Sequence, residues 1–242
     1  MYTPRTYRHT IRDTDLVSFN VVVKETDLFI RATSNLQRKA RKLVLKYREI
    51  LETYIKRYPL FLTSLEPFPI EDNAPQIIKI MSDAARKAEV GPMASVAGAI
   101  AEFVGSELSG FSPEIIVENG GDIYIKSLRN RTVGIYAGKS SFTGKIGLEI
   151  NGHDTPLGIC TSSGTVGHSL SFGTASAVIV LSKSTVLADA AATAIGNVIT
   201  QPEDIPFGIE LAKEIDGLKA VVIIKNDDMG LWGDVKICRI DS

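Results

Sequence analysis

The sequence predicts an α+β fold in which mixed or antiparallel sheets are covered by helices. Pairs of closely spaced apolar runs, such as 16–23 and 26–32, are typical of β-hairpins. Helical segments do not alternate strictly with the strands, which argues against a doubly wound parallel sheet. Hydrophobic residues make up 44% of the 242 residues, enough to bury a sizeable core. We therefore expect a single domain over residues 1–242.

The individual elements follow from apolar spacing and from residues that begin or end helices. Lys24 and Glu25 separate the first two strands, and Asn35 can cap a long amphipathic helix that ends before Pro59. Further helices are expected at 77–88, at 92–108, from Ser184 or Thr185 to about 199, and in the second half of 202–215. Further strands are expected at 114–118, 123–126, 131–136, 145–150, 158–161, 175–181, 220–224 and 232–240, with a turn at 227–230.

The segment 59–75 is rich in proline and is predicted to be an extended connection. Its apolar side chains are expected to be buried: Leu60, Phe61, Leu62, Leu65 and Phe68. This segment and the exposed edges of the sheet are also candidate surfaces for a homo-oligomer.

Composition and charge exclude several classes of protein. The 27 Lys and Arg nearly balance the 28 Asp and Glu, so no global charge favours a nucleic-acid partner. Two cysteines cannot form a disulfide scaffold. The N-terminus is unlike a secretory signal, and no apolar stretch of about 18 residues occurs. We therefore expect a cytoplasmic protein without a membrane partner. Basic residues are in excess over 1–60, either facing an anionic partner or forming a solvated helix face.

The first candidate site is carried by Asp189 and Thr193. The two residues are four apart on a predicted helix, so they lie on one face, one turn above the other. A carboxylate and a hydroxyl are hard oxygen ligands of the kind that Mg²⁺ or Ca²⁺ takes. The alternative is structural: an Asp near a helix start favours the helix dipole, and a mid-helix Thr bonds its own backbone.

Two loops supply further candidates. Gly120 and Gly121, followed by Asp122, form either a plain turn or a turn that admits a ligand close to the main chain. The second loop offers small hydroxyl residues and a glycine suited to cradle a phosphate, and it comprises Thr161, Ser162, Ser163 and Gly164. Cys160 or one of these serines, with His168, is also a candidate nucleophile and base.

The order of these segments resembles the ApbE-like superfamily of FAD:protein FMN transferases, also called thiamine biosynthesis lipoproteins. The resemblance rests on Gly-Gly-Asp after a strand, then Thr-Ser-Ser-Gly, then a loop from His168 to Gly173, then Ala-Asp-x-x-x-Thr at a helix start. It covers about residues 92–200, which we expect to form the half of the domain that holds the ligand site. The chain is most similar to a short, cytoplasmic branch of prokaryotic members, loosely associated with anaerobes and sulfur metabolism.

The resemblance implies a site for Mg²⁺ and for FAD or FMN. Asp189 and Thr193 would hold the metal, which contacts the pyrophosphate of FAD and assists transfer of FMN to a Thr or Ser of an acceptor protein. The nucleotide site would be shaped by Gly120, Gly121, Asp122 and the Thr161–Gly164 segment. His168 would be catalytic together with Asp189. The stretch after His168 is shorter than the family's His-Ile-Ile-Asp-Pro-Arg-Thr-Gly and lacks its Asp-Pro-Arg-Thr.

Two other functions stay open at this point. One is a thiol-dependent enzyme of sulfur metabolism that uses Cys160, whose pKa the dipoles of the following loop could lower. The other is a non-catalytic binding protein that has kept the fold and lost the transferase chemistry, as the shortened stretch after His168 would suggest.

Overall fold

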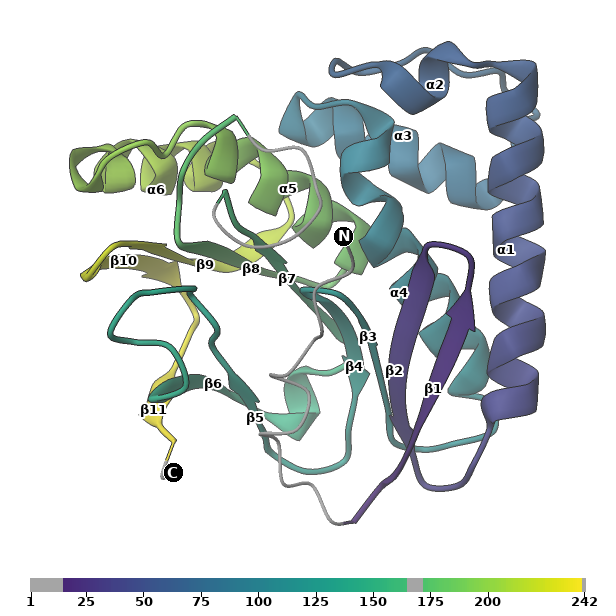
Figure 1. Ribbon diagram of the computed structural model, residues 1–242, viewed down its shortest axis with the longest axis horizontal. Coiled ribbons are helices and arrows are strands. Elements are labelled where there is room, and N and C mark those ends of the chain that lie inside the picture. Colours follow the sequence, from purple (N-terminus) through teal and green to yellow (C-terminus); the bar gives the residue numbers. More distant parts are fainter. Residues whose placement is uncertain (1–14, 165–171, 241–242) are drawn as a thin grey trace.

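The computed structural model describes residues 15–164 and 172–240, whose strands form two sheets (Figure 1). The larger sheet has eight strands in the order β1-β2-β3-β4-β7-β8-β9-β10, and the smaller has the order β11-β6-β5. Every pairing between neighbouring strands of the described residues is antiparallel. The α+β fold with helix-covered sheets is thereby confirmed.

The strands are β1 (Val17–Val23), β2 (Thr26–Ala32), β3 (Ile115–Asn119), β4 (Asp122–Lys126), β5 (Arg131–Gly134), β6 (Ile146–Ile150), β7 (Leu157–Ser162), β8 (Ala177–Ser182), β9 (Leu218–Lys225), β10 (Asp228–Gly233) and β11 (Ile237–Arg239). The α-helices are α1 (Gln37–Arg57), α2 (Leu60–Thr63), α3 (Gln76–Ala88), α4 (Val96–Leu108), α5 (Thr185–Asn197) and α6 (Ile205–Glu214). Short 3₁₀ turns are η2 (Pro92–Ser95), η3 (Gly152–Asp154) and η4 (Pro202–Asp204).

Both faces of the larger sheet are covered, one by helices and the other by the smaller sheet (Figure 1). Strand β8 shows the consequence, because its side chains alternate between the two cores. Val178 and Val180 pack on the helices, whereas Ile179 and Leu181 pack toward the smaller sheet. A strand that is buried on both faces reads as a continuous apolar run, which is why the sequence predicted a buried strand here.

The proline-rich segment differs from the prediction of an extended, buried connection. Residues Leu60–Thr63 form the short helix α2, and only Phe61 of its leucine and phenylalanine side chains is fully buried. Leu60, Leu62 and Leu65 are exposed, and Phe68 is half-buried. A single helical turn directs only one side toward the core, so the expectation of burial for the whole set was wrong.

The C-terminal strand also differs from the prediction. Instead of one strand over 232–240, β10 pairs with β9 in the larger sheet and β11 pairs with β6 in the smaller one. The turn lies earlier than predicted, at Asn226, which has a positive φ of 57°. Gly233, at φ 88°, ends β10 in a conformation that favours glycine and lets the chain pass from one sheet to the other.

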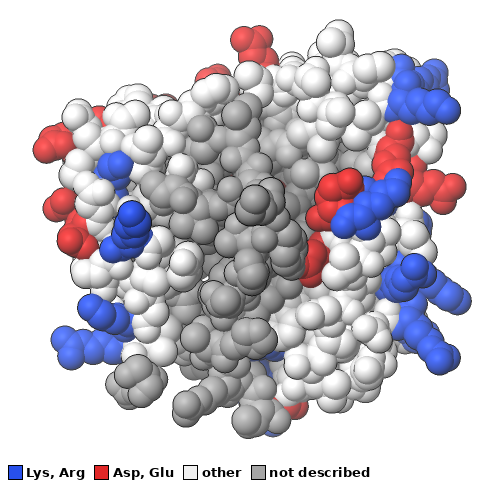
Figure 2. Space-filling model, in the orientation of Figure 1, with Lys and Arg blue, Asp and Glu red and all other residues white. Residues whose placement is uncertain are grey.

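The long helix α1 carries the basic residues noted in the sequence on its exposed side, where Lys and Arg gather at one edge of the molecule (Figure 2). Part of this charge is balanced by ion pairs, such as Lys46 with Glu107 and Arg48 with Glu25 and Glu52. In the part of the chain that the structure describes, none of the helices combines the length and the apolar character needed to span a bilayer.

Candidate functional site

Helix α5 is the element that carries the predicted metal ligands, and it lies almost entirely inside the protein. It begins as expected at Ser184, whose side-chain oxygen accepts a hydrogen bond from the Leu187 N–H at 3.3 Å. The helix packs on β7, β8, α3 and α4. The small side chains of α5 let these neighbours approach closely. The fully buried ones are Ala188, Ala190, Ala191 and Ala192.

Asp189 points from α5 toward the beginning of α4. The residue as a whole is 9% exposed, and Oδ2 accepts a hydrogen bond from the Gly98 N–H at 2.7 Å. The N–H of Ala97 also lies close enough to lower the pKa of this carboxylate. Free N–H groups at a helix start attract a carboxylate, so this oxygen caps the neighbouring helix α4. The structural alternative from the sequence placed Asp189 in the first turn of its own helix, and α5 has no acidic residue in its first turn. Thr193 lies one turn further along α5 and is half-buried.

The predicted glycine turn, Gly120–Gly121, joins β3 and β4 and places Asp122 at the start of β4. Gly120 has a positive φ of 75°, which favours glycine in this turn. Gly121 lies against the end of β7, because a Cβ added to it would stand 2.7 Å from the Thr161 carbonyl oxygen. The Thr161 N–H donates to the Gly121 carbonyl at 3.1 Å. Asp122 is buried.

The third predicted segment, Thr161 to Gly164, runs from β7 across the end of α5. A Cβ added to Gly196 of α5 would stand 3.2 Å from the Ser162 hydroxyl oxygen. Ser163 donates its hydroxyl to the Ser176 carbonyl at 2.8 Å, and Gly164 donates its N–H to the Ala175 carbonyl at 3.0 Å. The hydroxyl of Ser163 therefore contributes to holding this segment, while Ser162 faces α5.

The fold brings the carboxylates of Asp122 and Asp189 together beside Cys160. Burial raises the pKa of the Cys160 thiol well above its ordinary value, and the charges of both carboxylates raise it further. Burial likewise raises the pKa of Asp189, the charge of Asp122 adds to this effect, and the N–H groups of Gly98 and Ala97 oppose it. The site is a buried concentration of negative charge next to the Gly120–Gly121 turn.

The donor set of this site fits a hard divalent cation. In the described ranges, 15–164 and 172–240, no group of three or more His, Cys, Asp and Glu side chains is placed to hold a metal ion. Mg²⁺ is commonly bound by one or two carboxylates, with water and phosphate oxygens completing its shell. Asp122 and Asp189 offer two such carboxylates, and a cation would offset their unfavourable proximity. The part of Thr193 in this set stays a prediction.

The structure does not place every predicted residue, and it adds two that sequence reasoning missed. His168 lies outside the described residues, so its catalytic role stays a prediction. Gly98 and Glu102 of α4 both contact α5 and were not singled out. The only signal was the abundance of small residues in α4, which indicated close approach of another group without saying which one.

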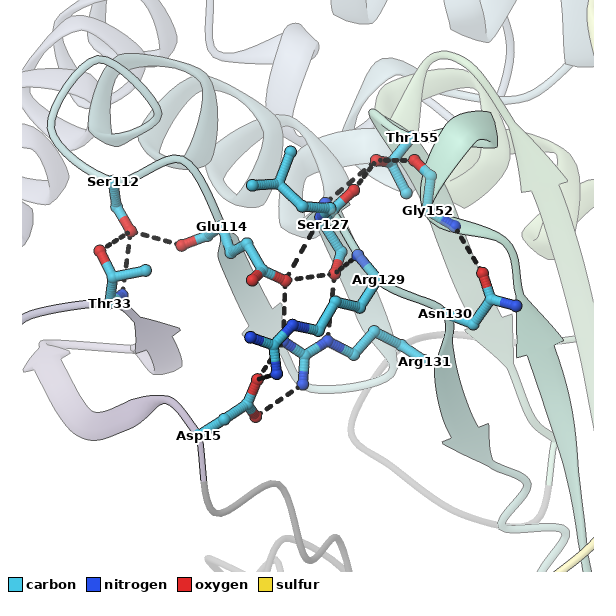
Figure 3. Close-up of polar contacts among 11 residues, drawn as sticks. Asp15, Thr33, Ser112, Glu114, Ser127, Arg129, Asn130, Arg131, Gly152 and Thr155 are labelled. Carbon is cyan, nitrogen blue, oxygen red and sulfur yellow. Dashed lines mark hydrogen bonds and ion pairs between the residues drawn. The ribbon is translucent and has the colours of Figure 1, made fainter.

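A second buried polar cluster lies at the opposite end of the β3–β4 hairpin and contains arginine (Figure 3). Arg131 is 7% exposed and donates to Glu114 Oε2 at 2.8 Å. It also makes a two-pronged contact with Asp15, at 2.8 and 2.9 Å. Ser127 donates its hydroxyl to the same Glu114 oxygen at 2.6 Å. This cluster joins β5 of the smaller sheet to the residue before β3 of the larger sheet, and its charges are paired.

Comparison with protein families and sequences identifies the relatives of this chain. The model of a family described as AbpE bacteria matches residues 8–217. The UPF0280 protein of Methanocaldococcus jannaschii is 42% identical over 221 residues, covering 89% of this chain and 90% of that protein. A UPF0280 protein of Methanopyrus kandleri is 41% identical over 226 residues, with 90% and 91% covered.

Solved structures with the same fold include a flavinyl transferase. The flavinyl transferase ApbE of Pseudomonas stutzeri superposes with a TM-score of 0.61 at 13% identity, covering 90% of this chain and 93% of that chain. The ApbE protein of Thermotoga maritima superposes with a TM-score of 0.57 at 11% identity, with 89% and 96% covered. The resemblance predicted from the sequence is confirmed, and at these identities the likeness shows the fold.

Proposed function

We propose that the chain, which belongs to the family described as AbpE bacteria, is a Mg²⁺-dependent transferase that binds a flavin dinucleotide. The observation that supports this function is the meeting of Asp122 and Asp189, two buried carboxylates, beside a glycine turn in the fold of flavin transferases. Two carboxylates in one buried site favour a cation or a proton between them, and a dinucleotide brings phosphates that share the cation.

In this proposal each segment of the site has its own task. Asp189, Thr193 and Asp122 hold the cation, which neutralises charge on the pyrophosphate when it is bound. Gly120 and Gly121 let the ligand approach the main chain of the β3–β4 turn. The segment Thr161–Gly164 borders the nucleotide from the side of β7, with the Ser162 hydroxyl turned toward α5.

The reaction is transfer of FMN from FAD to a hydroxyl of an acceptor protein. The oxygen of an acceptor Thr or Ser forms a bond to the FMN phosphorus, the bond to the AMP oxygen breaks, and AMP leaves. The hydroxyl proton needs an acceptor, and we assign this role to His168. A His168→Asn variant should then bind FAD normally and transfer FMN at least 100-fold more slowly, in the range expected for loss of a general base.

The geometry does not favour the thiol-dependent alternative. Cys160 is fully buried and its thiol donates to the Thr185 carbonyl at 3.3 Å. Burial and two neighbouring carboxylates raise its pKa, whereas a reactive thiol needs a lowered one. The non-catalytic alternative is not favoured either, because solved structures with this fold include flavin transferases.

The test measures FAD binding by quenching of flavin fluorescence, with Mg²⁺ and with EDTA. We expect binding that depends on Mg²⁺ and is weakened at least tenfold in Asp189→Asn. The matched control is Asp204→Asn, which changes a surface carboxylate that holds the start of η4 through the Thr200 and Gln201 N–H groups. A native chain that binds neither Mg²⁺ nor FAD would overturn the proposal.

A further inference from the structure

Helices α4 and α5 hold each other's first turns through two carboxylates. Glu102 of α4 accepts hydrogen bonds at Oε2 from the N–H groups of Thr185 at 2.5 Å and Val186 at 3.1 Å. The Ser184 hydroxyl donates to the same oxygen at 3.3 Å. In return, Asp189 of α5 accepts from the Gly98 N–H of α4 at 2.7 Å. Each helix therefore supplies the capping carboxylate of the other.

The two contacts are arranged so that they fix the position of Asp189. Gly98 lies opposite Asp189 and Glu102 lies opposite Thr185, so the helices run antiparallel. In each helix the two positions are four residues apart, about 6 Å along the axis. Two contacts at this separation prevent α5 from sliding or rotating against α4, and the carboxylate of Asp189 moves with α5.

The backbone of α4 can approach this closely only because residue 98 is glycine. A Cβ at this position would stand 2.6 Å from the Thr185 carbonyl oxygen and 2.8 Å from the Asp189 Cβ. Both groups belong to α5, and one is backbone, so the two helices would have to separate. The hydrogen bond from Gly98 to Oδ2 would lengthen as a result.

The contacts with α4 also use part of the hydrogen-bonding capacity of the Asp189 carboxylate. A carboxylate has two oxygens with about four acceptor positions, and the first turn of α4 takes part of this capacity at Oδ2. The remaining capacity of the carboxylate is available to a ligand. A group that holds one oxygen of a metal-binding carboxylate orients the other, and losing such a group typically weakens metal binding 10- to 100-fold.

We propose that Glu102 and Gly98 are positioning residues for the cation site: Glu102 fixes the start of α5, and Gly98 fixes the orientation of the Asp189 carboxylate. This inference rests on the proposed function, because it concerns the same cation. The proposed role of Glu102 depends on the length of its side chain, because an acceptor oxygen must lie within hydrogen-bond distance of the Thr185 and Val186 N–H groups.

The test is titration calorimetry with MgCl₂ alone, on the full chain without flavin. Glu102→Gln keeps an acceptor oxygen at the same reach, and we expect a dissociation constant for Mg²⁺ within about threefold of the native chain. Glu102→Asp keeps the charge and shortens the side chain by one methylene, and we expect at least a tenfold weakening. Gly98→Ala should weaken binding to a similar degree.

The control separates positioning from general stability. Asp204→Ala removes a carboxylate that holds the start of η4, just before α6, and lies outside the proposed site. It should lower the melting temperature by an amount comparable to Glu102→Asp and leave Mg²⁺ binding unchanged. Circular dichroism confirms that each variant is folded at the titration temperature. If Glu102→Asp fails to fold, the Mg²⁺ titrations of Glu102→Gln and Gly98→Ala test the proposal.

The outcomes distinguish this inference from the proposed function. If the native chain binds no Mg²⁺, the cation site is absent and both fall. If the native chain binds Mg²⁺ and Glu102→Asp binds it equally well, only the positioning role falls. If Glu102→Gln weakens binding as much as Glu102→Asp, the charge of Glu102 matters and its reach does not, which also overturns the inference.

Discussion

The two ends of the β3–β4 hairpin both bury carboxylates, and the pKa values of these carboxylates are shifted in opposite directions. At the open end, burial acts to raise the pKa of Glu114, but hydrogen bonds from Ser127 and Arg131 leave it below its ordinary value. At the turn end, burial and the charge of Asp122 raise the pKa of Asp189 well above its ordinary value. The ends are separated by strands of five residues, about 17 Å.

The comparison shows which of the two clusters is complete within the protein. Arg131 brings a positive charge to Glu114 and Asp15, so that end serves stability. The site at Asp122 and Asp189 brings two carboxylates together. Within the described residues, Asp189 forms no ion pair with Lys or Arg. A group at this end is stabilised by a proton or by an added cation, which is the property expected of a ligand site.

The largest effect is expected from removing the arginine at the open end. Arg131→Met should lower the free energy of unfolding by about 3–5 kcal/mol, because it leaves a buried carboxylate without its partner. Arg129→Met is the matched control: its side chain is exposed and contacts Asp15 only at 3.4 Å, so its effect should stay below about 1 kcal/mol. Urea unfolding measures both, and equal losses would contradict the distinction between the two arginines.

A smaller effect of opposite sign is expected at the turn end. The folded pKa of Asp189 is above its ordinary value of 3.8, so the folded state holds this proton more tightly than the unfolded state. Stability should therefore fall as pH rises above about 4. With EDTA at pH 7, Asp189→Asn should be more stable than the native chain by about 1–3 kcal/mol. Urea unfolding over a pH series checks this, and a larger pH-dependent loss in the variant would contradict it.

Asp122→Asn should produce an intermediate result. It removes the second cause of the raised pKa of Asp189 and leaves the first, burial, in place. The loss of stability with rising pH should therefore be smaller than in the native chain and larger than in Asp189→Asn. The same urea series measures it. A curve that coincides with that of the native chain would mean that the two carboxylates do not interact.

The smallest effect is expected on the thiols. In native buffer a maleimide should label Cys238, which is half-buried, well before Cys160, which is fully buried beside the two carboxylates. Peptide mass spectrometry assigns the labelled residue, and Cys238→Ala should leave the chain almost unreactive until it is unfolded. Rapid labelling of Cys160 in the folded chain would reopen the thiol-dependent alternative.

Much of the fold could be predicted from the sequence, because its elements are encoded locally. The spacing of apolar residues fixed the hairpin of β1 and β2 and the long helix α1, and Ser184 marked the start of α5. The prediction was wrong where the burial of a side chain depends on contacts with residues far away in the sequence. The leucines of α2 look like core residues in the sequence, yet only tertiary contacts decide that Leu60 and Leu62 face outward.

The candidate site shows the same division. The residue types and the four-residue spacing of Asp189 and Thr193 belong to the sequence alone, and so does the glycine turn before Asp122. The contact of Gly98 with Asp189 joins residues 91 apart, and that of Glu102 with Thr185 joins residues 83 apart. Only the tertiary structure could decide these contacts, because they depend on the antiparallel packing of α4 on α5 and on the strand order β4-β7-β8, which no local pattern specifies.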